Sequence, residues 1–206
     1  MKNTLNKIEE LYSNLLNKHG NDSNAVGWNT SECQNLRFQK LTSVIKNSED
    51  IYSINDYGCG YGAHLDYLIE KGYKINCYNG YDVSKPMLKE AKKSQEKHNL
   101  KLNLHQTQNI ITLADYTFVS GTFNVKFETS EKEWKFFIQK KLEEINRFSR
   151  IGFSFNILTS YVEWKEDHLY YGDPLFWFDL CKKSFSKKVS LIHDYPLWEW
   201  TICVTK

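Results

Sequence analysis

The chain has 206 residues, of which 41% are hydrophobic and 25% charged, and its formal net charge is +2. This composition is typical of a globular protein, and we expect a single domain over residues 1–206. A net charge so near zero gives no reason to expect nucleic acid or an anionic membrane as partner. No apolar run approaches the roughly 20 residues that cross a bilayer. The five cysteines form no CxxC pair, and they favour reduced thiols in a cytoplasm over a disulfide framework or a zinc site.

Residues 1–50 are expected to form a helical cap. Leu5, Ile8 and Leu11 begin a series of apolar residues at helical spacing, and a polar loop follows it. A second helix is expected from about Ser31 to Asn47. From residue 51 onward strands and helices alternate, so residues 51–206 are expected to form the core.

The core is expected to contain seven strands, in the segments "YSIND", "YKINCYNGYDV", "LKLNLHQ", "YTFVSG", "RIGFSFNIL" and two parts of "KVSLIHDYPLWEWTICVTK". Helices are expected from Ala63 and Lys85, after the capping box of Ser130 and Glu133, and after Asp173. This alternation predicts an α/β fold with a Rossmann-like, doubly wound, mostly parallel sheet. The last two strands lack an intervening helix, which predicts an antiparallel final strand at the sheet edge.

The segment "DYGCGYG", residues 56–62, places three glycines between the first strand and the following helix. A strand, a glycine turn and a helix N-terminus often form a nucleotide site. Asp82 ends the second strand about 20 residues later, where an acid can accept hydrogen bonds from both ribose hydroxyls. An ordinary tight turn is the alternative for the glycines. The loop also fits a nicotinamide-binding fingerprint, but Asp56 suits an ammonium or sulfonium better than a pyrophosphate.

The segment "INDYGCGYGAHLDYL" resembles motif I of the class I S-adenosylmethionine-dependent methyltransferases. "YNGYDVSKPMLKEAKK", "ADYTFVSGTFN" and "GFSFNIL" resemble later elements of that family in the right order, so the resemblance covers about residues 50–160. Two residues depart from the family pattern. Asn55 stands where an aliphatic residue is usual, and Tyr57 is bulkier than the usual spacer.

This resemblance implies S-adenosylmethionine as the cofactor and a residue-by-residue site for it. The glycine loop would pack against the methionine part, Asp82 would hold the ribose, and Gln108 or Asn109 would bind the adenine amine or be plain surface residues. The implied cofactor residues are Asp56, Gly58, Cys59, Gly60, Gly62, Asp82, Val83, Met87, Gln108, Asn109, Ser120 and Gly121.

The segment "VGWNTSECQNLRF" resembles an N-terminal segment of a bacterial subgroup of these enzymes. Gln34 and Arg37 lie on one face of the expected second helix. Arg37 could pair with the methionine carboxylate of the cofactor, or with an acid in a surface salt bridge. Trp28 could cover the cofactor or belong to the cap core.

The acceptor is expected beyond the carboxyl ends of the strands. His193 is the candidate catalytic base because a neutral imidazole titrates near working pH; a capping hydrogen bond is the alternative. Asp194 adjoins it, although neighbouring strand residues point to opposite faces. No cluster of His and carboxylates indicates a metal, although Asp194 with Asn156 could in principle bind Mg²⁺. The candidate acceptor residues are Asn124, Asn156, Tyr161, Tyr170, Tyr171, Tyr195 and Trp198.

Together these features predict a cytoplasmic methyltransferase that acts on a small molecule, at an oxygen of a sugar or surface-polysaccharide precursor. No nucleic acid and no membrane is expected as partner, and the sequence does not determine the oligomeric state. Two alternatives stay open: an NAD-dependent oxidoreductase, and an inactive, cofactor-binding partner subunit of a methyltransferase complex.

Overall fold

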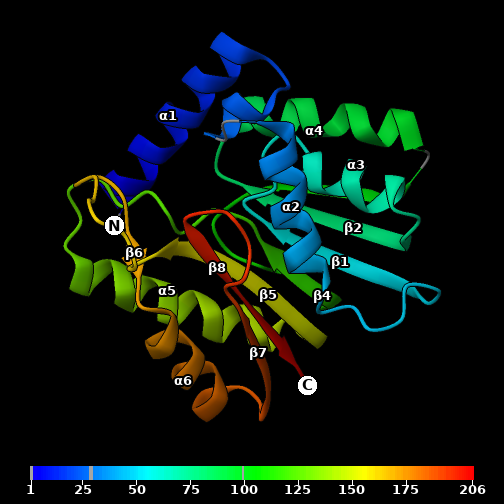
Figure 1. The fold of residues 1–206 in the computed structure, drawn as a ribbon. Coiled ribbons are helices and arrows are strands. Elements are labelled where there is room, and N and C mark those ends of the chain that lie inside the picture. The colour runs from blue at the N-terminus through cyan, green and yellow to red at the C-terminus, as the bar shows by residue number, and fades with distance from the viewer. Residues whose placement is uncertain (1, 28–29, 99) are drawn as a thin grey trace.

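The computed structural model describes residues 2–27, 30–98 and 100–206. A sheet lies between two layers of helices (Figure 1). The strand order is β3-β2-β1-β4-β5-β8-β7, with β6 beside β5. The strands are β1 (Ile51–Tyr57), β2 (Lys74–Asp82), β3 (Leu102–Gln106), β4 (Ala114–Val119), β5 (Ser149–Thr159), β6 (Tyr171–Gly172), β7 (Lys188–Ile192) and β8 (Glu199–Thr205).

The sheet is mostly parallel, and its last strand is antiparallel, as the sequence predicts. β8 runs antiparallel to both β5 and β7. Two details differ from expectation. The short β6 is an additional strand, and β8 lies between β5 and β7 rather than at the edge. β8 is buried over nearly its whole length, and it pairs with β5 on one side and with β7 on the other.

The helices begin where the capping residues predict. They are α1 (Lys2–His19), η1 (Ser23–Val26), α2 (Ser31–Thr42), α3 (Ala63–Glu70), α4 (Lys85–His98), α5 (Glu131–Arg147) and α6 (Pro174–Ser184). The Ser130 hydroxyl accepts from the Glu133 amide at 3.3 Å and donates to its carboxylate at 2.7 Å. Asp173 accepts from the Leu175 amide at 2.9 Å. α2 ends earlier than expected because the Ser43 hydroxyl donates to a carbonyl of its last turn at 2.6 Å.

Helices α2, α3 and α4 cover one face of the sheet, and α5 and α6 cover the other (Figure 1). The α5–α6 face contains the larger aromatic core, with Trp134, Trp177 and Trp200 fully buried. The N-terminal cap therefore has two parts. α2 packs on the sheet face, where it contacts β5 and β8, whereas α1 contacts η1 and α4.

The connection from β3 to β4, residues 107–113, contains no helix. Beside it, three asparagines form a ladder across paired strands. The Asn79 amide donates to Asn55 Oδ1 at 3.0 Å, and the Asn103 amide donates to Asn79 Oδ1 at 2.8 Å. Asn55 in turn donates to the Thr112 carbonyl at 2.8 Å. This ladder explains the unusual Asn55 of motif I, because its amide holds the connecting loop.

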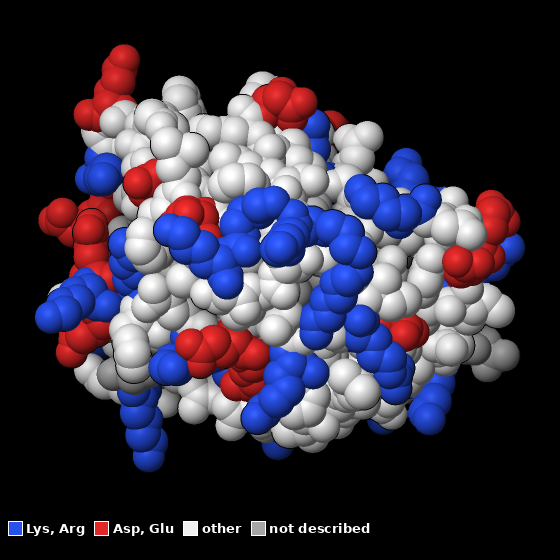
Figure 2. Space-filling model, turned by 90° about the horizontal axis from the view of Figure 1, so that it is seen from below, with Lys and Arg blue, Asp and Glu red and all other residues white. Residues whose placement is uncertain are grey.

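Figure 2 shows Lys and Arg side chains gathered in a band on one face of the molecule, with acidic side chains around it. Several lysines near the end of the chain donate to backbone carbonyls. Lys188 Nζ lies 2.8 Å from the Lys206 carbonyl, and Lys206 Nζ lies 2.5 Å from the Ser149 carbonyl. Among the described residues, no helix combines the length and apolarity that crossing a bilayer requires.

Candidate functional site

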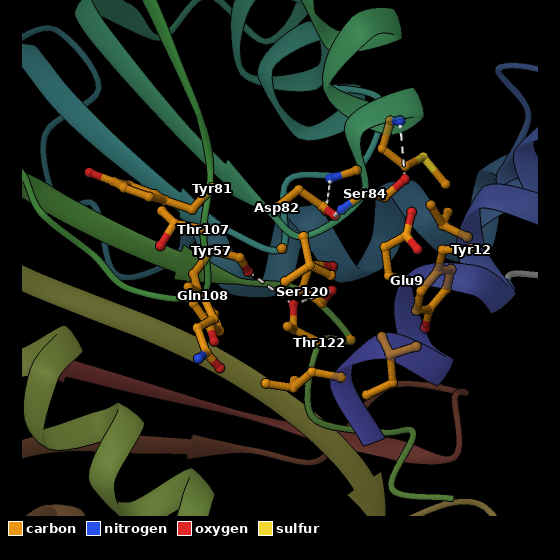
Figure 3. Close-up of a pocket in the computed structure, with 18 of the residues that line it drawn as sticks. Glu9, Tyr12, Tyr57, Tyr81, Asp82, Ser84, Thr107, Gln108, Ser120 and Thr122 are labelled. Carbon is orange, nitrogen blue, oxygen red and sulfur yellow. Dashed lines mark hydrogen bonds between the residues drawn. The ribbon is translucent and has the colours of Figure 1, made fainter. Parts of the chain in front are cut away.

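Two adjoining cavities lie at the carboxyl ends of β1, β2 and β4. The larger, here called the edge cavity, has a volume of about 800 Å³ including space open to solvent. Its walls include Glu9, Tyr12, Gly58, Asp82, Gln108 and Ser120 (Figure 3). The smaller, here called the loop cavity, has about 330 Å³ on the same measure, and its walls include Gln34, Phe38, Asp56, Gly58, His64 and Ser120.

The glycine loop separates the two cavities and needs its glycines. Gly58, Gly60 and Gly62 have φ angles of 79°, 55° and 90°, in the left-handed region that glycine adopts most readily. A Cβ on Gly58 would also lie 2.1 Å from Thr122 Oγ1. Gly58 and Gly60 line both cavities, whereas Gly62 caps α3. The loop is thus a turn that forms a cavity wall.

Asp82 is fixed at the end of β2 by two backbone amides, one in the glycine loop and one just before α4. Its Oδ2 accepts from the Gly60 amide at 2.9 Å, and its Oδ1 accepts from the Ser84 amide at 2.8 Å. Burial raises the pKa of Asp82 to about 6, and these two hydrogen bonds oppose the rise. At pH 7 the group is therefore an oriented carboxylate that lines the edge cavity. Each of its oxygens has a further lone pair for a ligand.

Helix α1 forms the opposite wall of the edge cavity, as Figure 3 shows for Glu9 and Tyr12. Burial, and to a lesser extent the charge of Asp82, raises the pKa of Tyr12 to about 12. The Ser13 and Ser84 hydroxyls lie 2.9 Å apart and join α1 to the segment after β2. α1 is therefore bonded directly to the neighbourhood of Asp82.

The predicted cofactor residues after β2 and β3 divide into two groups. Val83, Met87 and Gln108 line the edge cavity. Asn109 lines neither cavity, and its Oδ1 lies 3.5 Å from Lys141 Nζ. The prediction that Asn109 contacts the cofactor is thus not supported, because its side chain turns toward α5.

Two residues of α5, Lys141 and Glu144, hold the loop between β3 and β4, and the sequence analysis predicted neither. Lys141 Nζ donates to the Gln108 carbonyl at 2.5 Å and pairs with Glu144 at 2.8 Å. Glu144 Oε1 accepts from the Ile110 amide at 2.5 Å. In the sequence this pair looks like an ordinary solvent-exposed i,i+3 pair. Only the burial of Lys141, 5% exposed at its side chain, distinguishes it.

The loop cavity contains Asp56, whose carboxylate accepts a hydrogen bond from the Tyr78 hydroxyl. Gln34, which is predicted to bind the cofactor, lines this cavity, and its Oε1 accepts from the Tyr61 hydroxyl at 3.2 Å. Cys59 also lines it, and burial raises the pKa of its thiol well above the usual value. Trp28 lies outside the described residues.

Arg37 does not line either cavity, contrary to the prediction that it meets the cofactor. Its Nε donates to Glu199 Oε2 at 2.7 Å, and the two side chains are only 8% and 0% exposed. The salt bridge considered as the alternative therefore exists, but it is buried. Burial raises the pKa of Glu199, and the charge of Arg37 opposes this rise. The pair joins α2 to β8.

The turn after β4 is held from β5. The Gly121 amide donates to Asn156 Oδ1 at 2.7 Å, so Asn156 holds this turn, and it lines neither cavity, contrary to the prediction of an acceptor-pocket residue. Ser120 lines both cavities.

The other predicted acceptor residues also line neither cavity. Asn124, Tyr170 and Tyr195 are buried. Asn124 Oδ1 accepts from a β5 amide at 3.2 Å, Tyr170 accepts from an indole N–H at 3.2 Å, and Tyr195 shares a 2.8 Å bond with a threonine hydroxyl. These three are packing residues, which corrects the prediction. Tyr161 and Trp198 are exposed, and the Tyr171 hydroxyl accepts from the Glu166 amide at 3.2 Å.

His193 and Asp194 follow β7 and lie at the same edge of the sheet, but they do not form a dyad. The His193 ring lies against Tyr161, with 5.9 Å between the ring centroids. Asp194 accepts from Lys40 at 3.0 Å, and this contact lowers its pKa. Neither residue lines the two cavities, so a catalytic role for them stays a prediction. Within the described parts of the chain, no group of three or more His, Cys, Asp or Glu side chains is placed to hold a metal ion.

Comparisons with known proteins agree with this geometry. A family profile described as a methyltransferase domain matches residues 54–150. "Putative methyltransferase Rv1506c" of Mycobacterium tuberculosis is 46% identical over 164 residues, which cover 79% of this chain and 98% of that protein.

Solved structures share the fold. One is magnesium protoporphyrin IX methyltransferase from Synechocystis PCC 6803 with S-adenosylhomocysteine bound, which has a TM-score of 0.67 and is 10% identical. The match covers 98% of this chain and 99% of that one. The DhpI complex with S-adenosylmethionine and HEP has a TM-score of 0.62 and 11% identity, covering 97% of this chain and 95% of that one.

Proposed function

This chain belongs to the class I S-adenosylmethionine-dependent methyltransferases, and we propose that it methylates an oxygen of a small molecule, such as a sugar or a surface-polysaccharide precursor. S-adenosylmethionine supplies an electrophilic methyl group on its sulfonium. The chain's own residues bind the two reactants, orient them and keep water out, which can provide most of the rate in an in-line displacement.

The two cavities fit this cofactor. The oriented carboxylate of Asp82 suits two ribose hydroxyls, and Val83, Met87 and Gln108 form the wall beside it for the adenine. The loop cavity would take the methionine end, beside Asp56 and Gln34. His64 and Ser120 also have buried polar atoms in that cavity without a hydrogen-bond partner among the described residues, and such atoms suit a polar ligand.

The lining of the edge cavity carries the proposal of a small acceptor. Beyond Asp82 its walls come from α1 and α5, with Leu5, Ile8, Trp134 and Phe137 among them. These apolar walls surround a few polar groups, among them Glu9 and Asp82, and such a lining is typical of small-molecule sites. The name of the Synechocystis relative, a magnesium protoporphyrin IX methyltransferase, also supports an acceptor of this class.

Methylation of a hydroxyl oxygen requires a group that removes the hydroxyl proton. Glu9 is our candidate base, because it reaches the edge cavity from α1 and accepts from the Ser13 hydroxyl at 2.9 Å. His193, the candidate from the sequence, stays the second choice because it lines neither cavity. The exposed neighbour Glu10 offers a matched control.

The experiment supplies S-adenosylmethionine carrying a ¹³C-methyl group to the purified chain with size-separated fractions of a bacterial extract. We expect label in the small-molecule fraction, with the ¹³C shift of a methyl ether or ester. Label in macromolecules, or on nitrogen, would contradict the proposed acceptor, and turnover by the chain alone would exclude the inactive partner subunit. With the acceptor found, Glu9→Gln should lower turnover while Glu10→Gln should not. A loss in His193→Ala alone would instead favour His193.

A further inference from the structure

The loop cavity contains a buried imidazole whose ring nitrogens form no hydrogen bond with the described residues. His64, in the first turn of α3, is only 2% exposed. Its ring stacks on Phe38, with 4.6 Å between centroids, and meets the edge of Phe118 at 4.8 Å. Among the described residues, neither ring nitrogen has a hydrogen-bond partner. Buried polar groups nearly always have such partners, so this histidine points to a ligand.

The surroundings of His64 indicate the chemistry of that ligand. Nδ1 lies 3.7 Å from Asp56 Oδ2, too far for a hydrogen bond. The Ser120 hydroxyl, also buried and without a partner among the described residues, lines the same cavity. A neutral imidazole offers one N–H donor and one lone pair. The cavity thus combines a carboxylate acceptor with one or two donors, which complements a zwitterion with both an ammonium and a carboxylate.

We propose that His64 recognises the amino-acid end of S-adenosylmethionine, donating its N–H to the carboxylate while Asp56 accepts from the ammonium. The inference rests on the placement of the cofactor under the proposed function. An anion alone would face the charge of Asp56, and an apolar group would leave the ring nitrogens unpaired. The stacking of the imidazole on Phe38 fixes the ring plane, so the N–H is oriented before the ligand arrives.

Two ligands isolate this contact. S-adenosylhomocysteine carries the amino-acid end, whereas 5′-methylthioadenosine has the same nucleoside and lacks it. Calorimetry would measure both dissociation constants for the wild type and for His64→Phe, which keeps an aromatic ring against Phe38 and removes both nitrogens. We expect His64→Phe to raise the dissociation constant of S-adenosylhomocysteine by about tenfold or more. The dissociation constant of 5′-methylthioadenosine should change by less than about twofold.

His105→Phe is the matched control. His105 stacks on Tyr81 with 4.9 Å between centroids, its buried Nε2 also has no partner among the described residues, and it lines neither cavity. The control should leave both affinities unchanged. His64→Gln, which keeps one donor and one acceptor, should lose less S-adenosylhomocysteine affinity than His64→Phe. It also keeps the inference testable should the phenylalanine variant fail to fold.

An equal loss for both ligands in His64→Phe would overturn the inference, because it would assign His64 a purely structural role. Unchanged S-adenosylhomocysteine affinity would overturn it as well. A wild-type chain that bound neither compound would overturn both the inference and the cofactor placement. A wrong acceptor class would leave these results unaffected, since no acceptor is present.

Discussion

Asp82→Asn tests whether the oriented carboxylate at the end of β2 holds the ribose. In the wild type both oxygens accept from backbone amides, at 2.9 Å from Gly60 and 2.8 Å from Ser84, and both can still accept from a ligand. Asparagine replaces one oxygen with an NH₂ group that cannot accept from an amide or a hydroxyl. Hydrogen bonds to charged groups contribute about 1.5–3 kcal/mol each. We therefore expect the S-adenosylhomocysteine dissociation constant to rise by about 10- to 150-fold.

The same variant should change the pH dependence of binding. Burial raises the pKa of Asp82 from 3.8 to about 6, so the carboxylate becomes protonated as pH falls through that value. Wild-type affinity should be constant above about pH 7 and weaken by about tenfold near pH 5, because a protonated carboxyl has lost the charge that the ribose hydroxyls would meet. The affinity of Asp82→Asn should lack this step.

Stability of the ligand-free chain should change in the opposite direction. The folded pKa of Asp82 is raised, so protonation stabilises the fold below about pH 4 and this contribution is lost as pH rises through about 6. A rise from 3.8 to about 6 corresponds to at most about 3 kcal/mol, and less for a carboxylate beside a solvent-open cavity. Calorimetric titrations between pH 5 and 8 check the binding part. A flat wild-type profile together with less than twofold weakening in Asp82→Asn would refute the reasoning.

Three further substitutions test other parts of the site, each against a matched control. Gly58→Ala should lower the thermal midpoint and abolish S-adenosylhomocysteine binding, because its Cβ would lie 2.1 Å from Thr122 Oγ1. Gly72 has nearly the same φ but no atom within 4 Å of where a Cβ would lie, so Gly72→Ala should lower the free energy of unfolding by only about 1–2 kcal/mol and leave binding intact. Lys141→Met should weaken the binding of both S-adenosylhomocysteine and 5′-methylthioadenosine, because it releases the loop after β3 that contains Gln108. Lys140→Met breaks an ion pair whose side chains are more than half exposed and should change neither affinity. Arg37→Met should destabilise the fold by about 3–5 kcal/mol in denaturant unfolding, because it leaves Glu199 buried without its counter-charge. Lys40→Met, which breaks a more exposed pair, should cost less than about 1 kcal/mol. Equal effects of a substitution and its control, in any of these three pairs, would contradict the role assigned to that residue.

The local features of the site could be predicted from sequence because they depend on short-range chemistry. The positive φ angles of Gly58 and Gly60 are what a glycine-rich turn between strand and helix requires. Asp82 could be predicted as a site residue from its position at the end of the second strand alone. The caps at Ser130 and Asp173 are likewise set by neighbouring residues.

The features that sequence reasoning missed depend on contacts between distant segments. Arg37 meets Glu199, a residue that only the insertion of β8 beside β5 brings to α2. Lys141 looks like a surface residue until α5 packs against the loop after β3. Tyr170 and Tyr195 have amphipathic side chains that suit a pocket wall or a core equally well, and packing placed them in the core.

A crystal structure of the chain with S-adenosylhomocysteine is the most direct test of the account. We expect both ribose hydroxyls within about 3.2 Å of the Asp82 carboxylate, the adenine beside Val83 and Gln108, and the amino-acid end in the loop cavity beside Asp56. A nucleoside bound elsewhere, or an Asp82 carboxylate without contact to the ribose, would contradict it.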